Sequence, residues 1–212
     1  MNLKNARNIR IGGGSAVQIQ MDGVLAWSMP PEGFKLLDYI EMTGTNYINT
    51  GFIPNQDTRI ICEFMYKGGN GIYGARTSTA SNNYALRMIS GNWQPGYNAK
   101  LATTSIKSDT TQWHIADQNK NMFSLDGEIV MTFDYENFKA PKPIILGGIY
   151  ANNSVYYGEG RYRRCTIYDN GVLAVNLIPC KAPNGTIGMY DTVSAIFIAY
   201  SGTEEPIAGA EI

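Results

Sequence analysis

Hydrophobic and polar side chains alternate along two short stretches of the chain. In Arg59–Tyr66, every second residue from Ile60 onward is hydrophobic, so these side chains share one face of an extended strand. In Glu128–Tyr135, every second residue from Ile129 onward is hydrophobic, and the residues between them are polar apart from Val130. A period of two residues indicates half-buried strands, which belong to antiparallel sheets.

Three two-residue turn signals lie between strand-like stretches. They are Asp22-Gly23, Asp126-Gly127 and Asn170-Gly171. Asp, Asn and Gly tolerate the positive φ that a tight hairpin turn requires. No stretch of about 12 residues has the apolar spacing of an amphipathic helix. We therefore predict an all-β, antiparallel protein.

The composition supports strands and excludes some classes of partner. Among 212 residues are 14 Tyr, 7 Phe, 3 Trp, 23 Gly and 9 Pro, which suits pleated strands joined by turns. A net charge of -1, with 17% charged residues, gives no electrostatic footprint for nucleic acid. Apolar runs such as Ala195–Tyr200 are too short to cross a bilayer, and Met1–Asn8 does not open like a signal peptide. We expect neither membrane insertion nor export.

Residues 1–28 form a predicted unit of their own, which we call the arm. Ile9–Ile11, a glycine step and the hairpin Val17–Trp27 would make a sheet too small to be stable alone. The arm must therefore pack on the main domain, on another copy or on a partner. A proline-rich linker extends to Gly33, and the main domain spans residues 34–212. The predicted assembly residues are Val17, Ile19, Leu25 and Trp27.

Cysteine and histidine are too sparse for a disulfide framework or a transition-metal site. Cys62, Cys165 and Cys180 are far apart in sequence, and His114 is the sole histidine. We expect buried free thiols, with a Cys165–Cys180 bridge across the Asn170-Gly171 hairpin as the alternative. We interpret His114 as a packed, structural residue, because no catalytic partner accompanies it in the sequence.

Several segments resemble a known family of domains. They are Leu37–Gly51, Gly74–Ser78, Gly160–Gly171, Ile178–Cys180 and Gly188–Asp191. Together they resemble laminin-G-like, concanavalin A-like jelly-roll domains of gut bacteria and their tailed phages, over roughly residues 35–200. The resemblance implies an antiparallel jelly-roll β-sandwich and frequent glycan binding. The arm is similar to short β-segments that precede receptor-binding or virion-surface modules of tailed phages.

The same family includes glycoside hydrolases, so catalysis needs a separate test. Those enzymes resemble one another in a Glu-x-Asp-x-x-Glu strand that places two carboxylates across the scissile bond. Glu41, Glu63, Glu128 and Glu159 lack acidic partners at that spacing. We predict that the protein is not an enzyme.

Calcium is the cofactor to weigh, because related jelly rolls often hold one. A calcium site needs clustered oxygen ligands, and the aspartates that could supply them are scattered along the chain. We predict no cofactor and no dedicated metal site, with calcium as the alternative. The aspartates considered are Asp109, Asp117, Asp126, Asp134 and Asp191.

Two predicted loops combine aromatic and amide side chains, the mixture that binds sugars. In residues 92–98 we expect Pro95-Gly96 to form a turn that presents the aromatic residues, and residues 150–158 form the second loop. The alternative is that these aromatic residues cap the core or fill a subunit interface. The predicted carbohydrate-binding residues are Arg76, Trp93, Tyr97, Asn152, Asn153, Tyr156 and Tyr157.

The roles of four arginines remain open from the sequence. Arg76 is either a cation that faces a ligand or the partner of a buried acid. Strand alternation places Arg161 and Arg163 on one face and Arg164 on the other. We interpret these three as a solvated strand face, with an ion pair between subunits as the alternative.

These observations lead to a functional prediction. We expect a non-catalytic, phage virion-associated protein, such as a fibre, tail or capsid-surface component. Each copy would bind cell-surface carbohydrate weakly, and many copies on one particle would make the binding effective. The expected partners are further copies of the chain, with a trimer favoured, other virion proteins and a host glycan. The expected location is the virion, assembled in the host cytoplasm. The alternatives are a structural decoration or fibre subunit without a ligand, a bacterial surface adhesin, and a glycan hydrolase.

Overall fold

The described part of the chain consists of strands and connecting segments. The computed structural model describes residues 8–10, 18–21, 24–78 and 80–212, with side chains from Ser28 onward. None of these residues forms a helix, which confirms the all-β prediction. Accordingly, the described residues contain no helix long and apolar enough to cross a membrane.

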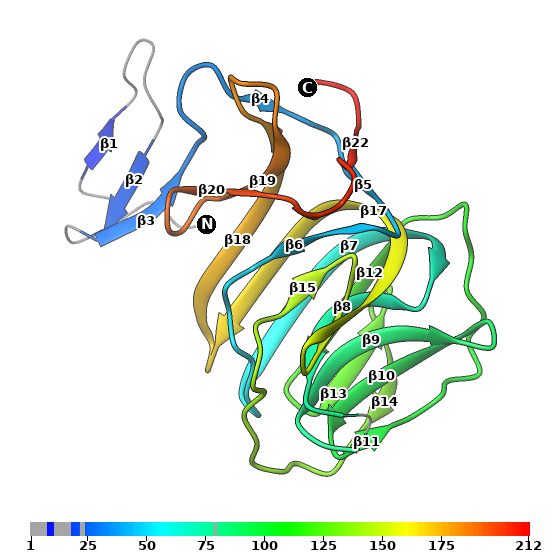
Figure 1. The fold of residues 1–212 in the computed structure, drawn as a ribbon. Coiled ribbons are helices and arrows are strands. Elements are labelled where there is room, and N and C mark those ends of the chain that lie inside the picture. The colour runs from blue at the N-terminus through cyan, green and yellow to red at the C-terminus, as the bar shows by residue number, and fades with distance from the viewer. Residues whose placement is uncertain (1–7, 11–17, 22–23, 79) are drawn as a thin grey trace.

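A first sheet is built around the two longest strands, β7 and β17 (Figure 1). Three short strands extend its margins: β4 (Lys35–Leu36), β5 (Ile40–Thr43) and β22 (Ile207–Ala208). Its main strands, in spatial order, are β14 (Glu128–Thr132), β13 (Met122–Leu125), β12 (His114–Asn119), β7 (Thr58–Gly69), β17 (Ser154–Asp169), β18 (Val172–Lys181), β19 (Ile187–Asp191) and β20 (Ile196–Ala199).

A second sheet shares β17 with the first, because the opening residues of β17 pair with β16. Short strands complete its margin: β15 (Ile145–Leu146) pairs with both β8 and β6 (Asn46–Asn49), and β21 (Ser201–Gly202) pairs with β6. Pairing is antiparallel except between β8 and β16. Its main strands, in spatial order, are β11 (Lys100–Leu101), β10 (Asn92–Asn98), β9 (Asn83–Ile89), β8 (Gly71–Arg76) and β16 (Gly148–Ala151).

The core lies where these two sheets face each other. The alternation predicted in β7 is confirmed for Ile60, Cys62 and Phe64, which are fully buried, but it ends at Met65, which is buried although the pattern predicts that it faces outward. The Phe64 ring from the first sheet meets the Trp93 ring of the second edge-on, at 5.5 Å between centroids. The Tyr84 hydroxyl of β9 donates to the Gln118 carbonyl of β12 at 2.7 Å. Aromatic side chains thus join the layers, as in a β-sandwich.

Two of the predicted tight turns are confirmed. Asp126-Gly127 has φ values of 52° and 89°, and Asn170-Gly171 has 46° and 83°, so each joins its strands through a primed turn. Ser90-Gly91, with φ of 47° and 76°, makes a similar turn between β9 and β10 that we did not predict. The third predicted turn, Asp22-Gly23, lies outside the described residues.

The alternation predicted for Glu128–Tyr135 is wrong in two respects. The strand β14 ends at Thr132, and Ile129 is 65% exposed instead of facing the core. A bulge between Phe123 and Ser124 shifts the register of β13 against β14. Among the described strands β14 forms its ladder with β13 alone, so its side chains are not held between two neighbouring strands.

The arm contains a three-stranded antiparallel sheet, as predicted. Its strands are β1 (Asn8–Arg10), β2 (Gln18–Met21) and β3 (Val24–Ser28). At the end of β3, the Ser28 amide donates to the Thr192 carbonyl of the main domain at 2.9 Å. Val17 lies outside the described residues, as do the side chains of Ile19, Leu25 and Trp27, so their assembly role stays a prediction.

The three thiols are free and buried, so the alternative of a Cys165–Cys180 bridge is wrong. Cys165 instead lies directly opposite Cys62 across β17 and β7. Burial raises the pKa of the Cys62 thiol, and burial raises that of Cys180 to about 12. The Cys62 and Cys180 thiols are therefore protonated at neutral pH and pack as small apolar groups.

The predicted facing of the β17 arginines is wrong for Arg164, which does not lie on the core face opposite Arg161 and Arg163. A bulge between Tyr162 and Arg164 makes Arg163 an extra residue, so Arg163 and Arg164 both stay outside the core while Cys165 is buried. Arg161 pairs with Glu41. Arg163 bonds both Asp38 (3.1 Å) and Glu63 (3.3 Å). Arg161 and Arg163 are thus held by ion pairs within the chain, whereas Arg164 Nε donates to the Asn176 side chain at 3.3 Å.

Candidate functional site

Two predicted sugar-binding residues, Trp93 and Tyr97, belong to the core. Trp93 is 0% exposed and Tyr97 is 1% exposed, so the prediction that they form a surface platform is wrong. The reason is that residues 92–98 form strand β10 instead of a loop, with Pro95 opposite Leu86 and Gly96 opposite Ala85. The alternative reading, in which these aromatic residues fill the core, is confirmed.

The second predicted loop is a hairpin that presents one aromatic side chain. β16 and β17 are joined through Asn152 and Asn153, and Asn152 has a φ of 51°. Tyr156 is 48% exposed. Tyr157, the next residue, points to the opposite face and packs near Tyr47, at 6.2 Å between ring centroids. Tyr156 and Asn152 therefore remain candidates, whereas Tyr157 lies away from them.

Arg76 lies beneath this hairpin at the end of β8. Its backbone carbonyl accepts a hydrogen bond from the Asn152 amide at 3.4 Å, and its guanidinium lies 4.8 Å from the centre of the Tyr156 ring. The residue is only 4% exposed, and its Nε and Nη1 atoms are buried without a hydrogen-bond partner. Within the described part of the chain, no carboxylate pairs with it. The alternative that Arg76 is the partner of a buried acid is therefore wrong.

A second arginine, Arg87 of β9, contributes charge to the same place. Its Nε donates to the Gln94 side chain, and Gln94 in turn donates to the Thr103 hydroxyl at 2.6 Å. Burial lowers the pKa of Arg87, and the positive charge of Arg76 lowers it further. The two guanidinium groups thus lie close enough to repel each other.

These side chains line two adjoining hollows that share Arg76 and Tyr156. We call them together the Arg76 cleft. One hollow has a volume of about 150 Å³ and is lined by Asn70, Arg76, Arg87, Met88, Ile89, Ile149 and Tyr156. The other has a volume of about 310 Å³ and is lined by Arg76, Thr77, Ser78, Ala151, Asn152, Ser154 and Tyr156.

The Arg76 cleft is small, open and positively charged. Its lining includes two arginines and no acidic residue. Its volume is at the lower end for ligand pockets, which hold about 300 Å³ or more, so it suits one sugar-sized group. The Tyr156 ring offers an apolar face, and amide and hydroxyl groups of Asn152 and Ser154 can bond hydroxyls. The cleft can therefore bind a polar ligand that carries negative charge.

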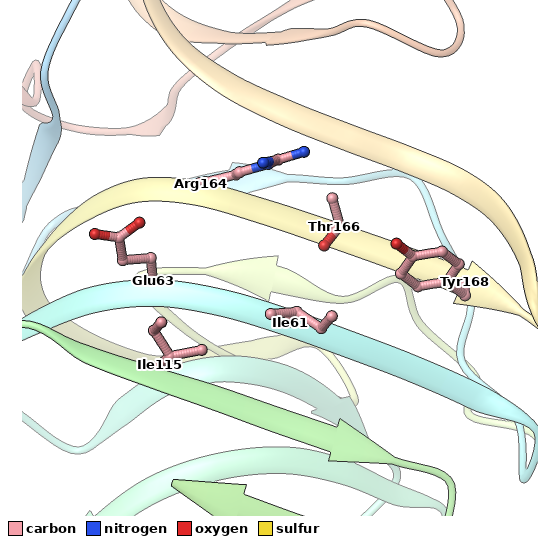
Figure 2. A pocket seen from close by; sticks show the side chains of 6 residues that line it. All are labelled: Ile61, Glu63, Ile115, Arg164, Thr166 and Tyr168. Atoms are coloured by element: carbon pink, nitrogen blue, oxygen red, sulfur yellow. The ribbon is translucent and has the colours of Figure 1, made fainter. Parts of the chain in front are cut away.

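A hollow on the outer face of the first sheet differs from the Arg76 cleft. Figure 2 shows it crossing three strands, with Glu63 from β7, Ile115 from β12 and Arg164 from β17 around it. Here the charges have partners within the chain, because Glu63 bonds Arg163 and Arg164 Nε donates to Asn176 at 3.3 Å. This hollow is not assigned to the site, because the negative charge of Glu63 is already paired with Arg163 and Arg164 bonds Asn176.

Three of the titratable groups considered in the sequence make structural contacts. His114 is 9% exposed, its Nδ1 lies 2.8 Å from Asp126, and its ring packs edge-on against Trp93 at 5.7 Å. Glu41 and Glu63 are bound to arginines. The described residues contain no group of three or more His, Cys, Asp or Glu side chains placed to hold a metal ion.

Sequence reasoning found Arg76, Asn152 and Tyr156, and the structure brings these three together. It missed Arg87 and Gln94, which come from neighbouring strands of the second sheet. The available signal was a charged residue inside an otherwise hydrophobic strand, since Arg87 lies between Leu86 and Met88. Asn153 lies in the hairpin turn and lines neither hollow.

Comparisons with known proteins do not assign the chain to a family: no family model matches it, and no curated protein sequence matches it.

Proposed function

We propose that the protein is a non-catalytic, lectin-like component of a phage virion that binds cell-surface carbohydrate through the Arg76 cleft. The observation that carries the proposal is Arg76 itself, a buried arginine with two unpartnered donors that lines both hollows of the cleft. Buried donors without partners lower the stability of the free protein, and a ligand that accepts hydrogen bonds from them would offset this loss.

Tyr156 supplies the second element of a sugar site. It covers Arg76 with its ring while half of its surface stays open. An exposed aromatic face beside amide and guanidinium donors matches a sugar, which has apolar C–H faces and a rim of hydroxyl groups. Because the cleft is shallow, we expect weak binding at each site, made effective by many copies on a particle.

A glycan array probed with the full-length protein tests this function. Tyr156→Ala should abolish binding because it removes the ring above Arg76. Tyr150→Ala is the matched control, since Tyr150 lies on the same hairpin but faces the other side, where Lys142 lies 5.2 Å from its ring centre. An array blank for the unaltered protein, or equal loss in both variants, contradicts the proposal.

The arm supports a role in assembly, and with it the proposed virion location. Its sheet has only three short strands, which do not form a stable unit alone. Deletion of residues 1–28 should leave the main domain folded and reduce the oligomer, proposed as a trimer, in light scattering. Unchanged assembly would count against the arm. If the array is blank but the oligomer is stable, a purely structural fibre or decoration subunit becomes the better description.

A further inference from the structure

Arginines elsewhere in the molecule show what Arg76 lacks. Arg59 binds both carboxylate oxygens of Asp117, at 2.9 and 2.6 Å. Arg161 pairs with Glu41, and Arg163 bonds Asp38 and Glu63. These three are also more exposed than Arg76, yet each has an acid. Among the arginines whose side chains the structure describes, the most deeply buried is thus the one at Arg76, which has no acidic partner there.

The neighbouring positive charge makes this arrangement more costly. Arg87 lines the same hollow as Arg76, and its Nε is occupied by Gln94. Two cations that share one hollow repel each other, and burial strengthens the repulsion because water screens it less. An anion between them would remove the repulsion and satisfy the open donors of Arg76 in one step.

We propose that the ligand of the Arg76 cleft is an acidic saccharide, whose carboxylate or sulfate group is bound by Arg76 and Arg87. This inference rests on the proposed carbohydrate-binding function and narrows its ligand class. A guanidinium group matches the planar carboxylate and the sulfate ester better than it matches a neutral hydroxyl. Tyr156 then packs against the sugar ring, and Asn152 and Asn70 bond its hydroxyls from the two hollows.

The test is an array that pairs each acidic glycan with its neutral counterpart, including carboxyl-reduced uronides and desulfated forms. The full-length protein should prefer the acidic member of a pair about ten- to a hundredfold, which is the range of one charge-assisted bond. Uronides and sulfated glycans are separate arms, so the array also identifies which anion is bound. Arg76→Met should remove the preference, and Arg76→Lys should retain part of it because the charge remains.

Arg164→Met is the matched control, because it removes an arginine from the outer hollow of Figure 2 and leaves the cleft intact. Its acidic-glycan binding should equal that of the unaltered protein. Side-chain NMR provides a readout on the cleft itself: galacturonate should shift the Arg76 Nε–H signal saturably, and galactose should not.

Each other outcome overturns the inference. Binding to neutral glycans with no acidic preference refutes the acidic ligand and leaves the proposed function standing. Loss of the preference in Arg164→Met but not in Arg76→Met moves the site to the outer hollow. A blank array refutes the proposed function, and the ligand class with it.

Discussion

Replacing Arg76 by methionine should make the free protein more stable, which is an unusual expectation for a buried polar residue. The substitution keeps most of the side-chain volume but removes the charge. In the present structure, Arg76 is 4% exposed, and two of its nitrogen atoms are buried without partners. Methionine needs no partners and packs readily into irregular spaces.

The magnitude follows from two opposing contributions. Each buried donor without a partner costs about 1–3 kcal/mol, so its removal stabilises the folded state. The contact between the guanidinium group and Tyr156, at 4.8 Å, stabilises it by about 0.5–2 kcal/mol and is lost. For the two donors of Arg76 the first contribution is about 2–6 kcal/mol, so central values of about 4 and about 1 kcal/mol leave a gain of about 3 kcal/mol in the free energy of unfolding. For a chain of this size, each kcal/mol raises Tm by about 2–4 °C.

Thermal unfolding of Arg76→Met and Arg163→Met provides the comparison. Arg163 bonds Asp38 and Glu63, and its guanidinium lies 3.9 Å from the centre of the Trp113 ring. Loss of these contacts should lower the stability by about 1 kcal/mol. The same substitution should therefore raise Tm at Arg76 and lower it at Arg163. If Arg76→Met lowers Tm as Arg163→Met does, Arg76 is a structural residue and the reasoning fails.

Three further predictions concern the core. Trp93→Ala should reduce the free energy of unfolding by about 3–5 kcal/mol in urea denaturation, because it empties a fully buried site; an unchanged midpoint would contradict this. Gly158→Ala should lower the free energy of unfolding by about 1–3 kcal/mol, because a Cβ there would lie 1.7 Å from the Gly71 carbonyl oxygen. A stability equal to that of the unaltered protein would refute the close approach. Burial raises the pKa of Tyr84 and Tyr162 well above the ordinary value. The folded state therefore holds more protons at alkaline pH, so its stability is complete below about pH 10 and falls as the pH rises further. Ultraviolet titration should show these tyrosines ionising only with unfolding, and simple titration of all tyrosines near pH 10 would contradict it.

Short sequence patterns predicted two turns and the alternation of β7, because these features depend mainly on local conformation. The Asp126-Gly127 and Asn170-Gly171 turns need only residues that accept positive φ, so neighbouring sequence suffices. The alternation in β7 survives because that strand is paired on both sides and covers the core. Around β14, pairing on one side alone leaves the facing of Ile129 undetermined by its neighbours.

The wrong prediction at Pro95 shows what sequence alone does not carry. Proline normally interrupts a sheet because it has no N–H to donate. Here the Pro95 carbonyl accepts from Ala102, so the missing donor falls on the side of β10 that faces the loosely paired residues 101–104. The ladder to β9 stays intact. The orientation of the Pro95 peptide group decides the outcome, and it depends on how β10 pairs with Leu86 on one side and Ala102 on the other.

The sequence predicted only part of the Arg76 cleft, because the rest depends on strand pairing. Arg76 and the hairpin residues lie near each other through one strand pairing, in which Ala151 is the partner of Arg76. Arg87 joins them because a bulge between Gly71 and Tyr73 shifts β8 against β9. A register shift has no clear signature in the sequence, so the second cation could not be placed before the structure was known.

The pairing of β7 with β17 sets the order of events during biosynthesis. β7 lies at the centre of the first sheet, but its partner on one side is translated about a hundred residues later, so the ribosome needs on the order of 5–20 seconds to deliver it. Until then, β7 is present in the nascent chain but cannot pair with β17. Contacts this distant also slow folding after release. Production of the protein should therefore respond to chaperone supply and growth temperature more than a helical protein of equal length would.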